Sequence, residues 1–255
     1  MLDRSERYSR QLVLEGFGAE AQEKLNKGRV LVVGVGGLGT AAALYLAASG
    51  IGTIGLMDDD FVSLNNLNRQ ILHWSNDIGR PKTESAQEKL GAFNPGITIQ
   101  PLNQRFGETS GSGLLEQYDF VLDCLDNLET RLMLNEACVK HHRPFAHGGA
   151  IKFSGQITTV IPGQSPCLRC FLPSDPEGCH GTCERVGVLG PIVGIIGVLQ
   201  ALEAVKYLAG LGDLLTGRLL LFDGLAGSFD EINIERDPQC PVCGNVVGGS
   251  HGQPE

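Results

Sequence analysis

Positive charge is in short supply in this sequence of 255 residues. Lysine and arginine number 20, against 29 aspartates and glutamates, which gives a formal net charge of -9 at pH 7. A protein that binds nucleic acid through the phosphates depends on a basic face. We therefore expect no nucleic-acid partner, and the acidic surface instead favours a soluble enzyme or a basic protein partner.

The sequence also lacks an apolar leader and a clean apolar run. It opens with MLDRSERYSR, which is charged, so we expect no signal peptide. The longest stretch of glycine and apolar residues, Val186–Leu202, is broken by Pro191 and falls short of the ~20 apolar residues that a membrane span needs. We expect no membrane partner and a cytoplasmic location. Eight cysteines in such a chain indicate metal or thiol chemistry, not a disulfide framework.

Apolar runs and helix-like segments alternate over the first 150 residues. Arg29–Val33 and Thr53–Met57 are compact apolar runs, and the segment between them, GVGGLGTAAALYLAASG, has the composition of a helix. This order predicts a βαβ unit with parallel strands, preceded by two short helices in residues 4–26. The alternation then continues, with helices expected over 81–93 and 127–142 and strands over 97–102, 118–123 and 144–150. We expect an α/β protein with a doubly wound, Rossmann-like sheet that is parallel in its N-terminal half.

The pattern changes after Ala150, where the sheet is expected to be extended by mixed or antiparallel strands. The expected elements are strands over 156–161, 219–223 and 232–236 and a long helix over 190–211. Residues 245–255 are glycine-rich and polar and predict a disordered tail.

A glycine loop follows the first strand of the βαβ unit. Gly34, Gly36 and Gly39 match G-x-G-x-x-G, with a fourth glycine at Gly37. Such a loop lets a phosphate approach the backbone, and the following helix offers N–H donors at its N-terminus. Asp58 closes the next strand, 19 residues after Gly39, where an acid can bind ribose hydroxyls. The motif predicts nucleotide binding, and because it is typical of dinucleotide sites, a NAD-dependent oxidoreductase stays open.

Two C-x-x-C pairs predict a metal site. Cys167 and Cys170 form one pair, and Cys240 and Cys243 form the other, with 70 residues from the second cysteine to the third. Four thiolates give a closed tetrahedral zinc site of the structural type. A redox role is the rival for each pair alone, and the presence of two pairs disfavours it. The zinc would hold the end of the chain against the middle of the domain.

Other single residues support several interpretations. Cys183, in a polar loop next to glutamate and arginine, is either a nucleophile or an incidental thiol, and Cys179 has no assigned role. Cys124 and Cys138 lie in apolar contexts and are expected in the core. His147 ends a strand near the edge where ligands bind, and we favour a structural role over a catalytic one.

Eight motifs in one order carry a resemblance to a family. They are RYSRQ, GVGGLG, DDDFVSLNNLNRQ, GRPK, DCLDN, CLRC, TCERVGVLGP and CPVCG, and they extend from Arg7 to Gly244. The sequence closely resembles the ThiF/MoeB/HesA adenylyltransferases, bacterial relatives of the ubiquitin-activating enzymes. The resemblance implies an enzyme that uses ATP to adenylate the C-terminal glycine of a small ubiquitin-like sulfur carrier, of the ThiS or MoaD type. It also implies a homodimer with a structural zinc.

The resemblance assigns roles in the ATP site to particular residues. Gly37 would face the phosphates and Asp58 the ribose. Asn66, Arg69 and Lys82 would bind the triphosphate. Asp126 would bind the magnesium ion, and the next residue, Asn127, would lie beside the nucleotide.

Two further roles follow from the resemblance. Arg10 would reach the phosphates in the site of the partner subunit, and Cys183 aligns with a cysteine that thiamine-type members use in acyl-disulfide chemistry. No rhodanese-like extension follows the second cysteine pair, so a separate sulfurtransferase is expected. Because the nucleophile is a carboxylate with a pKa of ~3.3–3.7, already ionised at neutral pH, no general base is needed.

Three functions therefore remain to be compared. The first is the carrier adenylyltransferase, formed by a single domain of residues 1–244 with N-terminal helices (4–26), a nucleotide-binding half (27–150) and a carrier-binding and zinc half (151–244). The second is a zinc-containing NAD-dependent oxidoreductase, and the third is a non-catalytic scaffold. Two segments slightly favour the thiamine pathway over molybdopterin or another sulfur-containing metabolite. They are VGVLGPIVGIIGVLQALEA and LFDG.

Overall fold

The structure, a computed structural model, describes residues 4–107, 113–172 and 186–246. Its described strands form one eight-stranded sheet in the order β3-β2-β1-β4-β5-β6-β7-β8. The first five strands in this order pair in parallel and the last three are antiparallel. The sequence predicted this α/β class, with a parallel N-terminal half and an antiparallel extension, and the prediction is confirmed.

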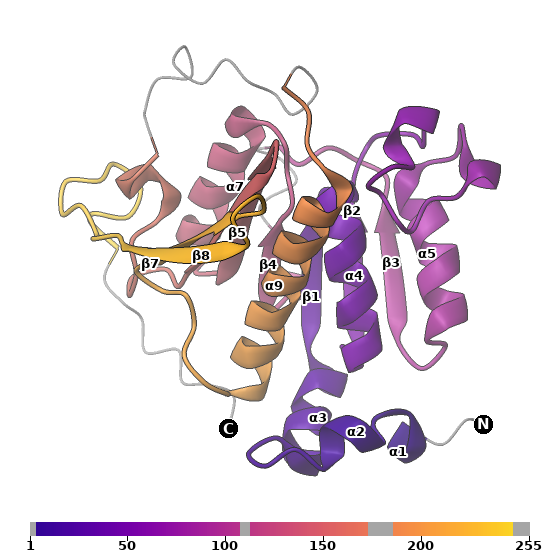
Figure 1. Cartoon of the computed structure of the whole chain (residues 1–255). Helices are drawn as coiled ribbons and strands as arrows, with labels where there is room; N and C mark the ends of the chain where they lie inside the picture. The colour runs from indigo at the N-terminus through magenta and orange to yellow at the C-terminus, as the bar shows by residue number, and fades with distance from the viewer. Residues whose placement is uncertain (1–3, 108–112, 173–185, 247–255) are drawn as a thin grey trace.

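The parallel half is built from alternating strands and helices (Figure 1). The elements are β1 (Arg29–Val33), α4 (Gly37–Ser49), β2 (Thr53–Met57), α5 (Lys82–Phe93), β3 (Thr98–Leu102), β4 (Phe120–Asp123), α7 (Leu128–Lys140) and β5 (Phe145–Ile151). The antiparallel half contains β6 (Ser154–Val160), α9 (Gly190–Ala209), β7 (Arg218–Asp223) and β8 (Ser228–Asn233).

Helices cover both faces of the parallel strands, because side chains along a strand alternate between the faces. In β1, Val30 and Val32 pack into one apolar cluster, together with α4, α5 and α9. Leu31 and Val33 pack into a second cluster on the opposite face, together with α7. Figure 1 shows α4 and α9 side by side on the first face and α7 behind the sheet.

The central helix α9 is the element that joins the two halves. Of the helices that the structure describes, it is the one long and apolar enough to cross a membrane, yet it lies in the core against α4. A Cβ at Gly197 would lie 2.3 Å from the carbonyl oxygen of Leu38, so glycine allows the two helices to approach closely. Its apolar composition is explained by burial.

Two expectations differ from the structure, and a third lies almost wholly outside the described residues. The N-terminal region forms three helices, α1 (Arg4–Arg7), α2 (Ser9–Leu12) and α3 (Gly18–Lys27), not two. The last strand begins at Ser228, four residues before the expected start, because a turn with Gly227 at φ +68° returns the chain directly from β7. All of β8 is exposed, so no apolar alternation marked it in the sequence. The expected tail, 245–255, falls outside the described residues after position 246.

Candidate active site

The glycine loop joins the end of β1 to the N-terminus of α4 through contacts that exclude side chains. Gly34 has φ +95°, and a Cβ there would lie 2.6 Å from the carbonyl oxygen of Cys124. A Cβ at Gly39 would lie 1.9 Å from the oxygen of Gly34. Any larger residue would therefore displace the loop, which supports the phosphate-binding interpretation of the motif.

Asp58 is bonded to this loop. Its Oδ2 accepts a hydrogen bond of 2.7 Å from the backbone N–H of Val35, and its Oδ1 accepts one of 2.8 Å from Asp60. Burial raises the pKa of Asp58, although the nearby Lys82 opposes that change. The carboxylate is thus fixed at the end of β2, beside the loop, where the sequence placed the ribose-binding acid.

A pocket of about 910 Å³ brings together most of the residues expected to bind ATP. Its wall includes the glycine loop and residues of strands β5 to β8. The expected residues in its wall are Gly34, Gly36, Gly37, Asp58, Arg69, Lys82, Asp126 and Asn127.

Two cationic side chains, those of Lys82 and Arg69, line this pocket. The Nζ atom of Lys82, at the N-terminus of α5, lies 2.7 Å from Oδ2 of Asp60, and its side chain is 7% exposed. Arg69 donates a hydrogen bond of 2.8 Å to the carbonyl oxygen of Asn65. Both line the pocket wall, and their contact with phosphate stays a prediction.

Two expected residues are absent from the pocket wall. Asn66 is buried, and its Oδ1 accepts a hydrogen bond of 3.1 Å from the N–H of Ser63 in the short helix η1 (Leu64–Asn66), just before Arg69. Gly39 lies beneath the loop, against Gly34. Their direct contact with the triphosphate stays a prediction.

Asp126 and Asn127 lie between β4 and α7 and have different roles in the structure. The side chain of Asn127 caps α7 by accepting a hydrogen bond of 2.9 Å from the N–H of Thr130. The cap of α7 is therefore Asn127 and not the neighbouring Asp126. Its carboxylate is exposed to the pocket and makes no hydrogen bond or ion pair with any described residue.

The donor set of the pocket fits a magnesium ion. Mg²⁺ prefers carboxylate and phosphate oxygens and keeps several waters. Asp126 offers such an oxygen, and oxygens of Asp58, Asp59 and Asp60 lie within 4.8 Å of one another across the pocket wall. Asp126 is the residue that would hold the ion against the phosphates.

Two of the expected catalytic residues are not among the described residues of the pocket wall. Arg10 is exposed on α2 and is not part of the pocket wall of its own chain. Cys183 and Cys179 lie outside the described residues.

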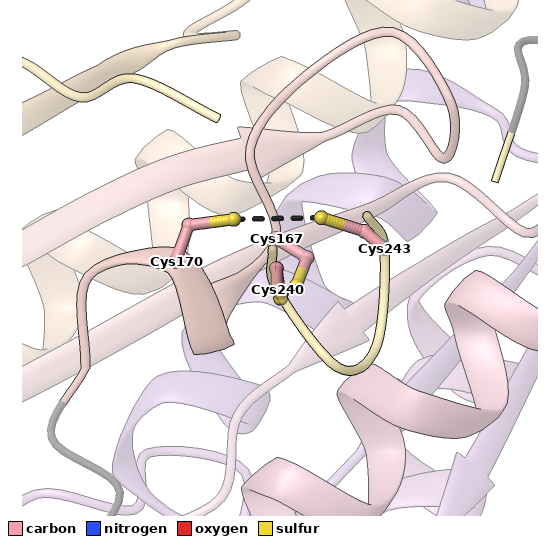
Figure 2. A group of neighbouring side chains, drawn as sticks. All are labelled: Cys167, Cys170, Cys240 and Cys243. Carbon is pink, nitrogen blue, oxygen red and sulfur yellow. Dashed lines mark hydrogen bonds between the residues drawn. The ribbon is translucent and has the colours of Figure 1, made fainter. Parts of the chain in front are cut away.

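The four paired cysteines form a compact cluster (Figure 2). The Sγ atoms of Cys167 and Cys240 are 3.7 Å apart, and those of Cys170 and Cys243 are 3.4 Å apart. Sulfurs bound to one zinc ion at ~2.3 Å in a tetrahedron lie ~3.8 Å from one another. A disulfide needs about 2.05 Å. The geometry therefore fits a structural zinc site and no disulfide.

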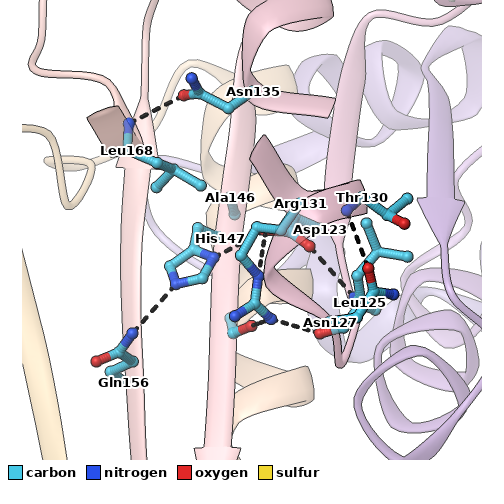
Figure 3. A network of polar contacts seen from close by, with 12 residues as sticks. Asp123, Leu125, Asn127, Thr130, Arg131, Asn135, Ala146, His147, Gln156 and Leu168 are labelled. Carbon is cyan, nitrogen blue, oxygen red and sulfur yellow. Dashed lines mark hydrogen bonds and ion pairs between the residues drawn. The ribbon is translucent and has the colours of Figure 1, made fainter. Parts of the chain in front are cut away.

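A buried polar network adjoins the pocket, and its members Arg131 and Gln156 line the pocket wall (Figure 3). Oδ2 of Asp123 lies 2.8 Å from Nδ1 of His147 and forms an ion pair of 3.1 Å with Nε of Arg131. The guanidinium of Arg131 also donates a hydrogen bond of 3.0 Å to the carbonyl oxygen of Gly148. Asp123 and His147 are fully buried. Burial lowers the pKa of His147, and Arg131 lowers it further, so the imidazole is neutral at pH 7. These contacts support the structural interpretation of His147.

Sequence reasoning missed other residues of the wall. Gln70 is 3% exposed, and in the part of the chain that the structure describes, its buried Oε1 has no hydrogen-bond partner. Its position directly after Arg69 was the only available signal. Gln156 gave no signal, because β6 resembled an ordinary strand.

The parallel sheet, glycine loop, cations and acids together define a nucleotide-binding α/β enzyme of the Rossmann-like class. Residues 8–242 match the ThiF family, and the chain belongs to this family. It is 44% identical over 240 residues to the molybdopterin-synthase adenylyltransferase of Escherichia coli (strain K12), covering 93% of this chain and 96% of that protein. It is 43% identical over 249 residues to the sulfur carrier protein ThiS adenylyltransferase of the same organism, covering 97% of each.

A longer relative and a solved structure extend the comparison. The chain is 46% identical over 239 residues to the adenylyltransferase and sulfurtransferase MOCS3 of Drosophila persimilis, covering 93% of this chain and 53% of that protein. Thus the chain spans about half the length of this relative. A crystal structure of E. coli MccB with ATP has a TM-score of 0.81 at 25% identity, covering 95% of this chain and 75% of that one.

Proposed function

We propose that this protein uses ATP to adenylate the C-terminal glycine of a small ubiquitin-like sulfur-carrier protein, with release of pyrophosphate. The carrier acyl-adenylate is the activated form from which a thiocarboxylate is made for molybdopterin or thiamine biosynthesis. The observation that carries the proposal is one pocket that joins the glycine loop, Arg69, Lys82 and Asp126 and continues to the glycine-rich strands β5 and β6.

The chemistry suits these residues. The attacking group is the carrier's terminal carboxylate, which is ionised at neutral pH and needs no base. The obstacle is repulsion between this anion and the triphosphate. Arg69 and Lys82 lower that repulsion and stabilise the departing pyrophosphate.

Two metal ions complete the proposal. Magnesium, bound by Asp126, would withdraw charge from the α-phosphate and the pyrophosphate. Zinc, bound by the four cysteines, would stabilise the fold at a distance from the chemistry.

The position of Arg10 supports a homodimer. This residue lies outside the pocket of its own chain, and a two-fold homodimer would bring it to the partner's phosphates. Cys183 would act after activation, in a covalent complex with the carrier. We further propose that a separate sulfurtransferase provides the sulfur and that the reaction takes place in the cytoplasm.

The alternatives fit the pocket less well. A NAD-dependent oxidoreductase needs no pair of cations such as Arg69 and Lys82 in its nucleotide pocket. A scaffold needs no carboxylate such as Asp126, which lines the pocket without a partner among the described residues. Membership of the ThiF family favours adenylation over both.

Pyrophosphate exchange tests the proposal. The protein is incubated with ATP, Mg²⁺ and labelled pyrophosphate, with and without purified ThiS or MoaD of Escherichia coli. We expect label in ATP only when a carrier is present, and no label when the carrier lacks its final two glycines. Lys82→Ala should abolish the exchange. Absence of exchange with both carriers would reject carrier adenylation.

A further inference from the structure

Small residues of β5 and β6 line part of the pocket wall. Gly149, Ala150 and Gly155 form part of this wall, with Gln156 among them. Gln156 is the polar side chain that β6 contributes here besides Ser154. This part of the pocket therefore exposes backbone of two small-residue strands beside one side-chain amide.

The side chain of Gln156 is fixed by its neighbours on β5. Gln156 pairs with Gly149 in the antiparallel register, and a Cβ at Gly149 would lie 3.2 Å from Cγ of Gln156. The absence of a side chain at Gly149 lets the amide pass over it. The Nε2 atom then reaches Nε2 of His147 at 3.2 Å, a diagonal neighbour across the two strands (Figure 3).

The hydrogen bonds of this network also fix which way the amide faces. The Asp123 carboxylate can only accept, so Nδ1 of His147 carries a proton and donates to it over 2.8 Å. The neutral imidazole then has a lone pair on Nε2, and that atom must accept from the NH₂ group of Gln156. Figure 3 shows the oxygen of Gln156 directed away from the imidazole. In the described part of the chain, no hydrogen bond is made by this oxygen.

We infer that Gln156 is a substrate-positioning residue, whose Oε1 accepts a hydrogen bond from a backbone N–H of the extended C-terminal tail of the carrier. A tail that ends Gly-Gly has no side chains for recognition, so its N–H and C=O groups are the atoms that can be read. Asp123 and His147 act through Gln156, because they hold its NH₂ group toward His147 and leave its oxygen free for the tail in the pocket. This inference rests on the proposed function.

The test is the Gln156→Met variant, which keeps the length of the side chain and removes the amide. Loss of one neutral hydrogen bond should raise the KM for the carrier about three- to tenfold in the exchange reaction and leave kcat within about twofold. The affinity for ATP alone, measured without carrier, should not change. The matched control is Gln87→Met on α5, which removes an amide bonded at 3.2 Å to Ile99; it should change neither constant.

His147→Phe tests the positioning role. If His147 acts through Gln156, the double variant His147→Phe/Gln156→Met should have the same carrier KM as Gln156→Met alone, within about twofold. If the two substitutions raise the carrier KM independently, so that their effects multiply in the double variant, His147 does not act through Gln156. If His147→Phe does not fold, Gln156→Met still decides the main claim.

Two outcomes overturn the inference. An unchanged carrier KM in Gln156→Met shows that the amide does not contact the tail. A fall in ATP affinity equal to the rise in carrier KM shows that Gln156 belongs to the nucleotide site. These two outcomes can be measured only if the wild-type protein exchanges pyrophosphate with ThiS or MoaD. If it exchanges with neither, the proposed function itself fails.

Discussion

The Sγ atoms of Cys170 and Cys243 lie 3.4 Å apart although 73 residues separate them in the chain. Cys170 ends the short helix η4 (Leu168–Cys170) after β6, and Cys243 lies in the segment after β8, so a metal held between them connects the two segments. Burial raises the pKa of Cys170 to about 11 in the metal-free cluster, and a bound zinc ion would replace its proton.

Cys170→Ser should therefore lower both the zinc content and the stability. We expect less than one zinc per chain by elemental analysis and a fall in Tm of about 4 to 8 °C, equivalent to about 2 kcal/mol in a domain of this size. The control is Cys138→Ser, which alters a buried thiol of the same core and should lower Tm with full zinc content. A zinc-free wild-type protein, purified without chelator, would contradict the prediction.

The two neighbouring residues Asp126 and Asn127 should separate chemistry from stability. Asn127→Ala removes the cap of α7 and should cost about 1 kcal/mol of unfolding free energy. Asp126→Ala removes no cap and should leave Tm unchanged. It should lower the exchange rate by about 100-fold or more because the magnesium ligand is lost. Equal losses of stability in the two variants would show that the assignment of the cap is wrong.

Asp77 should make stability depend on pH in the acid range. Burial alone would raise the pKa of Asp77, but hydrogen bonds from Lys89 at 2.6 Å and from the N–H of Trp74 at 2.8 Å bring it down to about 2. The folded-state pKa is below the unfolded value of ~3.9, so this carboxylate stabilises the fold above about pH 4 and loses its effect as the pH falls toward 2.

Asp77→Asn should therefore be less stable than the wild type at pH 7, by roughly 1–2 kcal/mol, and the gap should narrow between pH 4 and pH 2. Urea unfolding at several pH values measures the gap. The same change at the exposed Asp213 is the control and should produce no gap at any pH. A gap that is constant with pH would mean that the ion pair with Lys89 is not its source.

Sequence reasoning identified the local parts of the site well. The apolar run of β1, the glycines after it and Asp58 are close in sequence, and their spacing alone dictates a strand, a phosphate loop and an acid at the next strand end. The cysteine pairs were equally readable, since each C-x-x-C is local and zinc needs four ligands.

Contacts between distant segments were not readable. His147 and Asp123 are 24 residues apart, and their contact depends on the register of β4 with β5. Gln156 reaches His147 only because Gly149 leaves space between them. Nothing in the local pattern distinguishes such a glutamine from any polar strand residue. The position of β8 was missed for the related reason that an exposed edge strand has no apolar pattern.

Cys183 should be dispensable for activation. It lies outside the described residues, and its assignment rests on the order of the family motifs. Cys183→Ser should retain pyrophosphate exchange within about twofold, because adenylation needs no thiol. If the protein is of the thiamine type, the same variant should not form the covalent complex with the carrier, which non-reducing electrophoresis detects. A large loss of exchange would contradict a role after activation.

Arg10 provides a test of the dimer. Its side chain is exposed on α2 and does not line the pocket of its own chain, so a role in catalysis requires a second subunit. Arg10→Ala and Lys82→Ala should each be poorly active alone, because every site then lacks one cation opposite the phosphates.

Mixing these two variants should restore activity. In a mixed dimer, the site on the Arg10→Ala chain has its own Lys82 and receives Arg10 from the other subunit, while the opposite site lacks both. Random exchange makes about half of the dimers mixed, each with one complete site of two, so about a quarter of the wild-type rate should return. The rate is carrier-dependent pyrophosphate exchange before and after mixing, with subunit exchange verified by mass spectrometry of differently tagged chains. If the subunits exchange and the rate stays at the level of the single variants, Arg10 does not act on the partner's site.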